Sequence, residues 1–118
     1  MEYGSYDNIG ALAAYCYSTG LVSGTGSYIA GFLGDSSGIV TSCFYDRTTS
    51  GQSDTGKVTP EFTSEMQTES TFTSASEGGW DFAGETTNGT DDIWTIDTSA
   101  KPVKVNNGYP YLSALPPQ

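Results

Sequence analysis

The sequence predicts an all-β fold: short parallel β-solenoid coils with one short helix and an aromatic-rich C-terminal β cap. Two observations lead to this prediction. The 118 residues include 15 Gly and 8 Tyr, and with dense Ser and Thr this composition favours strands joined by tight turns. Two segments resemble each other at a spacing in the twenties, which is typical of a solenoid coil. Residues 1–58 would form the coils, and residues 59–118 would form the helix and cap packed on them, as one structural unit.

The repeat relates residues 16–27 to residues 43–54 at an offset of 27 positions. The copies match at a cysteine, an aromatic residue and a Ser-Gly pair: Cys16 with Cys43, Tyr17 with Phe44, and Ser23-Gly24 with Ser50-Gly51. A coincidental match in a chain rich in Gly, Ser and Thr is the alternative. The order in which the three features recur argues against it.

Each coil is expected to hold about three short strands. In the more complete coil these are Tyr28–Leu33, Gly38–Tyr45 and a weaker one near Arg47–Ser50. Stacked coils place equivalent residues about 4.8 Å apart. The segments that contain Cys16 and Cys43 should therefore be neighbouring parallel strands.

A Thr-Pro-Glu sequence at positions 59–61 predicts the start of a helix. Thr can cap a helix, Pro suits its first position, and Glu is favourable in its first turn. We expect a single helix, over Pro60–Gln67. Phe62 and Met66 are four residues apart and would share one face of it.

Apolar residues alternate farther on, at Trp80 and Phe82 and again at Trp94 and Ile96, as in half-buried strands. The main interpretation is that these side chains cap the open end of the solenoid. The alternative is that Trp80 and Trp94 form an exposed platform on which sugars stack.

The net charge of −10 comes from 4 basic and 14 acidic residues. Binding to nucleic acid requires Lys and Arg against the phosphates, so nucleic acid is not an expected partner. Membrane insertion is not expected either, because no apolar run has the length of a membrane span. No signal peptide follows Met1, so a secreted form would have lost its signal, or the chain would be an excised fragment.

Catalytic chemistry finds little support in the sequence. The chain has no His, which removes serine triads, Cys–His pairs and the commonest metal ligand. Asp91 and Asp92 near Glu85 are weak candidates for binding calcium, but no EF-hand pattern accompanies them. We expect no cofactor and no enzyme activity. The acids available for glycoside hydrolysis show no distinctive spacing: Asp35, Asp46, Asp54, Asp81, Asp91, Asp92 and Asp97.

Two further features are candidate modification sites. Cys16 and Cys43 occupy equivalent repeat positions, and secretion would permit a disulfide between them. Direct parallel stacking leaves their Cβ atoms farther apart than the roughly 3.8 Å of a disulfide, so a disulfide and an unbonded stacked pair both remain open. Asn88-Gly89-Thr90 matches the glycosylation sequon.

The repeat resembles the GLUG repeat of bacterial and archaeal surface proteins. The resemblance lies in IAGFLG at residues 29–34, SGIVTSCFYD at residues 37–46, and residues 16–26. The sequence after residue 48 also resembles the region that commonly comes after GLUG arrays. The resemblance implies an extracellular or cell-surface, adhesin-like protein, and it carries no catalytic residues over to this chain.

Stacked coils leave apolar end faces and strand edges that invite a further β layer. The leading hypothesis is therefore a structural or adhesive surface module that assembles end to end, as a stalk segment or filament subunit. Its partners would be copies of itself or adjoining repeats of a longer protein. A carbohydrate-binding module with glycan partners is the alternative, and a polysaccharide-active enzyme is the third hypothesis.

Overall fold

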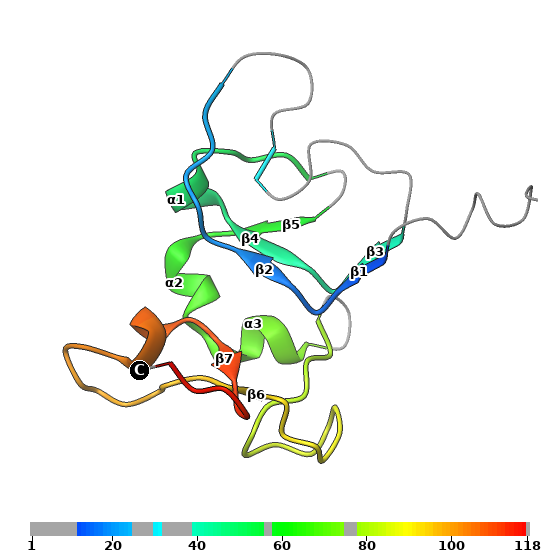
Figure 1. Ribbon diagram of the computed structural model, residues 1–118, viewed down its shortest axis with the longest axis vertical. Coiled ribbons are helices and arrows are strands. Elements are labelled where there is room, and N and C mark those ends of the chain that lie inside the picture. Colours follow the sequence, from blue (N-terminus) through cyan, green and yellow to red (C-terminus); the bar gives the residue numbers. More distant parts are fainter. Residues whose placement is uncertain (1–11, 25–29, 32–38, 56–57, 75–77, 118) are drawn as a thin grey trace, which may run out of the picture. The chain divides into compact units, whose positions relative to one another are not determined.

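The computed structural model describes residues 12–24, 30–31, 39–55, 58–74 and 78–117 (Figure 1). Its architecture is mixed α/β, with short strands in three small sheets and short helices between them. The chain divides into two compact units, Met1–Phe62 and Thr63–Gln118. The boundary therefore lies after Phe62 rather than after residue 58, and each unit is described by itself below.

The first unit is built from layers of parallel strands (Figure 1). Its strands are β1 (Leu12–Ala14), β2 (Tyr17–Ser18), β3 (Ile39–Thr41), β4 (Phe44–Asp46) and β5 (Thr59–Glu61). One sheet pairs β1 with β3, and a second sheet has the order β2-β4-β5. In the β1–β3 and β2–β4 pairs the partners are 27 positions apart, as Tyr17 and Phe44 are. This register confirms the predicted parallel pairing of the two repeat segments.

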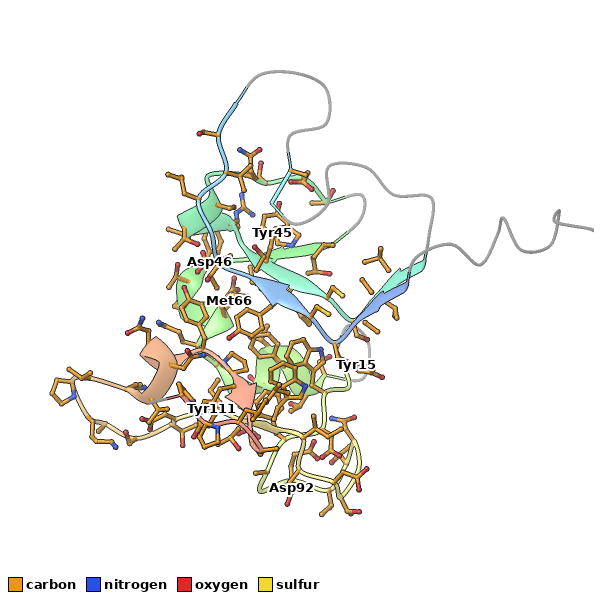
Figure 2. All side chains as sticks on the ribbon, viewed as in Figure 1. Tyr15, Tyr45, Asp46, Met66, Asp92 and Tyr111 are labelled. Carbon is orange, nitrogen blue, oxygen red and sulfur yellow. The ribbon has the colours of Figure 1, made fainter. Side chains whose placement is uncertain are left out.

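Equivalent corners join the strands within each of the first two layers. The chain turns at Tyr15 between β1 and β2 (Figure 2). It turns in the same way at Ser42 between β3 and β4. Their φ angles are 54° and 53°, in the left-handed region that non-glycine residues rarely adopt. The predicted strand Gly38–Tyr45 is thus two strands broken at Ser42. Most of the predicted strand Tyr28–Leu33 lies outside the described residues.

The predicted all-β solenoid is wrong, because the 27-residue spacing does not continue. β5 pairs with β4 only 15 positions along, with Thr59 opposite Phe44. The segment expected as a further strand, Arg47–Ser50, is the helix α1. The second unit is composed largely of short helices and loops. Within the described residues the repeat therefore builds two stacked layers and no regular coil.

Helix α1 forms because its two ends carry strong local signals. The Oδ1 atom of Asp46 accepts hydrogen bonds from the backbone N–H groups of Thr48 and Thr49, at 2.9 and 3.0 Å. Gly51, with φ 74°, ends the helix, and its N–H donates to the Arg47 carbonyl. A carboxylate at the N-cap and a left-handed Gly after the last turn favour a helix over a strand.

The second unit contains α2 (Thr63–Met66), α3 (Glu69–Thr73), β6 (Trp94–Thr95), the 3₁₀ helix η1 (Val105–Gly108) and β7 (Tyr111–Leu112). β6 pairs with β7 in antiparallel fashion. On its other side, Trp94 forms a parallel bridge with Phe82. The side chains of Met66, Phe72, Trp80 and Phe82 are fully buried and form the largest part of the core of this unit.

The prediction of a single helix over Pro60–Gln67 is wrong. Pro60 lies in β5, and α2 begins only at Thr63. Parallel pairing with β4 holds this segment extended and outweighs the local helix-start signal. Phe62 and Met66 do not share a buried face: Met66 is fully buried, whereas Phe62 is 52% exposed, with the Arg47 guanidinium 4.6 Å from its ring centroid.

Candidate functional site

Five of the acidic side chains that the sequence offers as catalytic or metal-binding candidates hold backbone in place. Backbone N–H groups of turns and loops donate hydrogen bonds to the carboxylates of Asp46, Asp54, Asp81, Glu85 and Asp97. Hydrogen bonds to an ionised acceptor are stronger than neutral ones. The acids therefore stabilise loops in a chain that has few basic side chains to pair with them.

Asp54 organises the interior of the first unit. Its side-chain Oδ1 accepts a hydrogen bond from the Gly31 N–H at 3.0 Å and one from the Tyr45 hydroxyl at 3.1 Å. The same hydroxyl lies 2.7 Å from the Asp54 carbonyl oxygen. Tyr45 is fully buried on β4 (Figure 2). Burial, together with the adjacent Asp54 carboxylate, raises the pKa of Tyr45 to about 12.

Replacing Tyr45 by Phe should lower the free energy of unfolding by about 1–2 kcal/mol at neutral pH, because the partly buried Asp54 oxygens lose the donor that the buried ring supplies. In the wild type the folded pKa of Tyr45 exceeds the ordinary value of 10.0. The unfolded tyrosine therefore ionises first, and this stabilisation is lost as pH rises from about 10 to about 12. Urea unfolding across that range should show the difference between wild type and Tyr45→Phe shrinking. A constant difference would contradict the assigned role.

Asp81 closes the loop that leads to β6. Its carboxylate accepts hydrogen bonds from the backbone N–H groups of Asp91 and Asp92, at 3.0 and 3.3 Å. Asp92 itself lies in the exposed loop, with φ 52° (Figure 2). Among the described residues, no three His, Cys, Asp or Glu side chains gather closely enough to hold a metal ion. The acids considered for calcium, Asp91, Asp92 and Glu85, thus form no such group.

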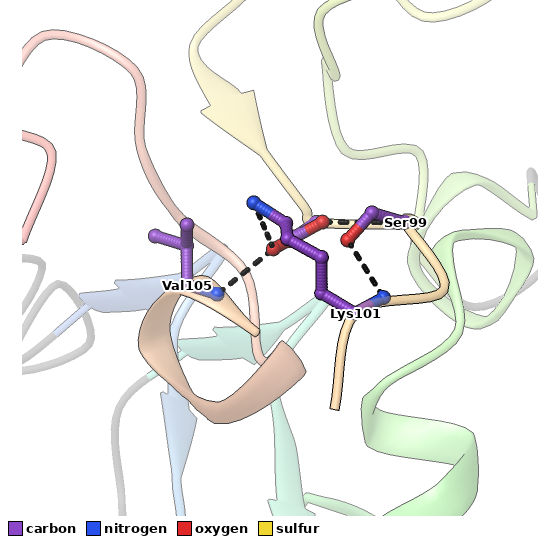
Figure 3. Close-up of polar contacts among 4 residues, drawn as sticks. Ser99, Lys101 and Val105 are labelled. Atoms are coloured by element: carbon purple, nitrogen blue, oxygen red, sulfur yellow. Dashed lines mark hydrogen bonds and ion pairs between the residues drawn. The ribbon is translucent and has the colours of Figure 1, made fainter. Parts of the chain in front are cut away.

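Asp97 anchors the loop before η1 through the backbone of Ser99 and Val105, which are labelled with Lys101 in Figure 3. One carboxylate oxygen accepts from the Ser99 N–H at 2.9 Å, and the other accepts from the Val105 N–H at 2.9 Å. The Lys101 ammonium lies 4.0 Å from the second oxygen and is largely exposed. The Ser99 hydroxyl and these backbone N–H groups hold the pKa of Asp97 well below its usual range. Asp97 therefore stays ionised at the pH values at which catalytic acids must carry a proton.

The candidate glycosylation residue Asn88 uses its side-chain nitrogen inside the structure. Its Nδ2 donates to the Thr73 carbonyl at 2.9 Å and to Glu85 Oε1 at 3.3 Å. Its backbone N–H donates to the other Glu85 oxygen at 3.2 Å. A glycan on Nδ2 would have to displace bonds that tie this loop to the end of α3.

The two tryptophans considered for sugar stacking lie in the core cluster of the second unit. Trp80 is fully buried. Its ring centroid lies 4.5 Å from that of Trp94 and 4.8 Å from that of Phe72. Trp94 is partly buried. Because stacking on a sugar requires an exposed ring face, Trp80 offers no platform in this structure.

Cys16 and Cys43 are both free thiols at equivalent positions of adjacent layers. The Cys16 carbonyl accepts a hydrogen bond from the Phe44 N–H at 3.0 Å, which ties the two segments together. Cys43 is buried with Tyr45 and Val58, and the partly buried Cys16 packs against this cluster. The structure thus brings this predicted pair together as an unbonded stack.

Sequence reasoning missed the structural roles of the acids and the helix α1. The signals were present for α1, since Asp46 and Gly51 stand at its two ends. No local pattern indicated Asp54, because its partners Gly31 and Tyr45 are distant in sequence. Asp35 lies outside the described residues.

No known protein family and no solved structure matches the chain. A curated protein of Evansella cellulosilytica, named "Putative Gly-rich membrane protein", is 41% identical over 92 residues. The match covers 73% of this chain but only 9% of that protein. The chain thus resembles a small part of a much longer protein. Within the described part of this chain, every helix is too short or too polar to span a membrane.

Proposed function

We propose that this chain is a non-enzymatic structural module of a larger cell-surface protein, which associates with neighbouring modules or further copies by adding strand layers. The observation that supports this proposal is the common 27-residue register of the β1–β3 and β2–β4 pairs. Both sheets stack one segment on its own repeat through parallel backbone pairing. Strand addition of this kind uses main-chain hydrogen bonds that another copy can supply.

The similar Evansella protein is consistent with the proposal, because its name describes a membrane protein and the matched region is 9% of its length. The described acids Asp46, Asp54, Asp81, Glu85 and Asp97 are engaged in holding backbone, which favours a structural role over a catalytic one. The burial of Trp80 gives the alternative of carbohydrate binding no support.

The first layer, β1 with β2, is where an added layer would pair. Among the described strands, whose orders are β1-β3 and β2-β4-β5, both strands of this layer occupy terminal positions. Ala14 of β1 pairs in register with Thr41 of β3. In-register side chains of parallel strands share a sheet face. Thr41 is exposed and Ala14 is partly buried, so this face permits a substitution in either layer.

Sedimentation velocity over a wide range of concentrations tests this proposal. We expect the wild type to form larger species as concentration rises, most clearly in added salt, because salt screens the repulsion between copies of charge −10. Ala14→Lys places a charge on the terminal strand, where Lys opposes strand addition. Its association constant should fall by at least about tenfold, the equivalent of about 1.4 kcal/mol.

Thr41→Lys is the comparison variant, because it adds the same charge to the same face of β3, the other terminal strand of this two-stranded sheet. If layers add next to β1, this variant should associate like the wild type. Equal loss in both variants would indicate a general charge effect or pairing next to β3, and either result would contradict addition at the first layer. A wild type that stays monomeric at every concentration and salt level would refute assembly through this edge.

A further inference from the structure

We propose that Cys16 and Cys43 form a reversible intramolecular disulfide that locks the first strand layer to the second when the chain meets a small-molecule disulfide oxidant. This inference goes beyond the proposed structural role, because it assigns a covalent modification site. It is independent of assembly, since both sulfurs belong to one chain.

The backbone places the two residues at disulfide distance. Cys16 and Cys43 each precede the residues Tyr17 and Phe44, which pair in parallel register. Cα atoms so paired are about 4.8 Å apart, within the span of about 4.4–6.8 Å that disulfides bridge. The hydrogen bond from the Phe44 N–H to the Cys16 carbonyl, at 3.0 Å, fixes this register at the cysteines themselves.

The two side chains also point the same way. The Cys16 Sγ–H donates to the carbonyl oxygen of Ala14 at 3.1 Å, and the Cys43 Sγ–H donates to that of Thr41 at 3.2 Å. Each thiol thus bonds the residue two positions before it, so the sulfurs stack as a ladder. A disulfide requires the Cβ atoms to approach from about 4.8 Å to about 3.8 Å. The terminal position of β2 in its sheet allows this small movement on one side.

The environment sets the order of reaction. Cys16 is only partly buried, whereas Cys43 is 4% exposed. Burial raises the pKa of the Cys43 thiol, and the adjacent Cys16 thiol raises it further. Cys16 is therefore the thiol that an external oxidant reaches first, and Cys43 is the resolving thiol.

The exchange balances with glutathione disulfide as the oxidant. The Cys16 thiolate attacks one sulfur of the oxidant, which breaks the oxidant's S–S bond, forms a mixed disulfide and releases one glutathione thiolate. The Cys43 thiolate then attacks the Cys16 sulfur and displaces the second glutathione. The chain loses two electrons and two protons. The oxidant gains the electrons, and the released thiolates take up protons from the solvent.

The test incubates the purified, reduced chain with glutathione disulfide and follows intact mass, free thiols and migration on a non-reducing gel. We expect the mass to fall by two hydrogen atoms with no retained glutathione, both thiols to disappear, and the chain to remain a monomer on the gel. Reduction with dithiothreitol should restore both thiols. The urea midpoint should shift upward on oxidation, because the bond constrains the segment between the two cysteines.

Serine variants separate this site from independent thiol chemistry. Cys43→Ser should stop at a stable glutathione adduct on Cys16. Cys16→Ser keeps a hydroxyl donor for the Ala14 carbonyl and should react at least about tenfold more slowly than the wild type, because burial holds Cys43 as the unreactive thiol. A stable mixed disulfide in the wild type, covalent dimers, or two thiols that persist in excess oxidant would each overturn the proposal.

Discussion

Trp80→Ala should unfold the second unit of the chain. Trp80 is fully buried and lies among Phe72, Phe82 and Trp94, with ring centroids 4.5–6.3 Å away. Truncating a buried aromatic residue to alanine costs about 3–5 kcal/mol through lost transfer energy and the cavity that remains. A whole domain is stable by only about 5–15 kcal/mol. A unit as small as Thr63–Gln118 has little reserve against such a loss.

Fluorescence and thermal melting followed by near-ultraviolet circular dichroism check this prediction. The chain has two Trp residues, so Trp94 is the remaining reporter in Trp80→Ala, and its emission should shift to the red as its surroundings open to water. Leu115→Ala is the control within the same unit, because Leu115 is 73% exposed. That variant should stay within about 0.5 kcal/mol of the wild type. If the two variants have the same melting temperature, Trp80 does not organise the core.

The repeat and the alternating aromatic residues were the parts of the fold that the sequence could reveal. The match of Cys16 with Cys43 correctly predicted which segments pair, their parallel direction and their register. The alternation at Trp80 and Phe82 correctly indicated burial. Both patterns identify side chains that are buried in the folded chain, and the burial of apolar side chains is the main driving force of folding.

The overall architecture could not be predicted from the repeat, because two matching copies do not determine the structure of the residues after the second copy. After β4, the carboxylate of Asp46 begins α1 and the next strand returns with a shorter spacing. At Pro60, pairing with β4 prevailed over a local helix signal. At α1 the local caps outweigh the strand expected from the repeat, and at Pro60 the tertiary partner outweighs the local signal.

The sequence predicted one part of the candidate site, the cysteine pair, and missed the contacts of the acidic side chains. The proximity of Cys16 and Cys43 follows from repeat spacing, and the structure brings these residues together. The role of Asp54 depends on Gly31 and Tyr45, which reach it from separate segments. Contacts of this kind leave no periodic trace in the sequence. The sequence offered these acids only as weak candidates for metal binding or catalysis and gave no sign of their structural role, whereas the structure shows carboxylates that accept hydrogen bonds from backbone N–H groups.

Gly31→Ala should destabilise the first unit by about 2–3 kcal/mol, because the added methyl group overpacks the interior. A Cβ atom at Gly31 would lie 2.1 Å from both Cδ2 and Cε2 of the Tyr45 ring. Tyr45 is fully buried, and its hydroxyl is hydrogen-bonded to Asp54, so the ring has no free direction in which to move. The Gly31 N–H donates to the same Asp54 carboxylate. Displacing either residue therefore disturbs the whole network.

Gly20→Ala is the matched control, since nothing lies within 4 Å of a Cβ atom at that position. An alanine without a clash restricts the unfolded chain and stabilises a protein by about 0.4–1 kcal/mol. The same substitution should therefore lower the free energy of unfolding at Gly31 and raise it at Gly20, as measured by urea unfolding of each variant.

Gly31→Ala should also reduce the loss of stability that Tyr45→Phe causes, because the clash already disturbs the contact of the Tyr45 hydroxyl. Equal stability of the two alanine variants would mean that Gly31 does not contact the Tyr45 ring.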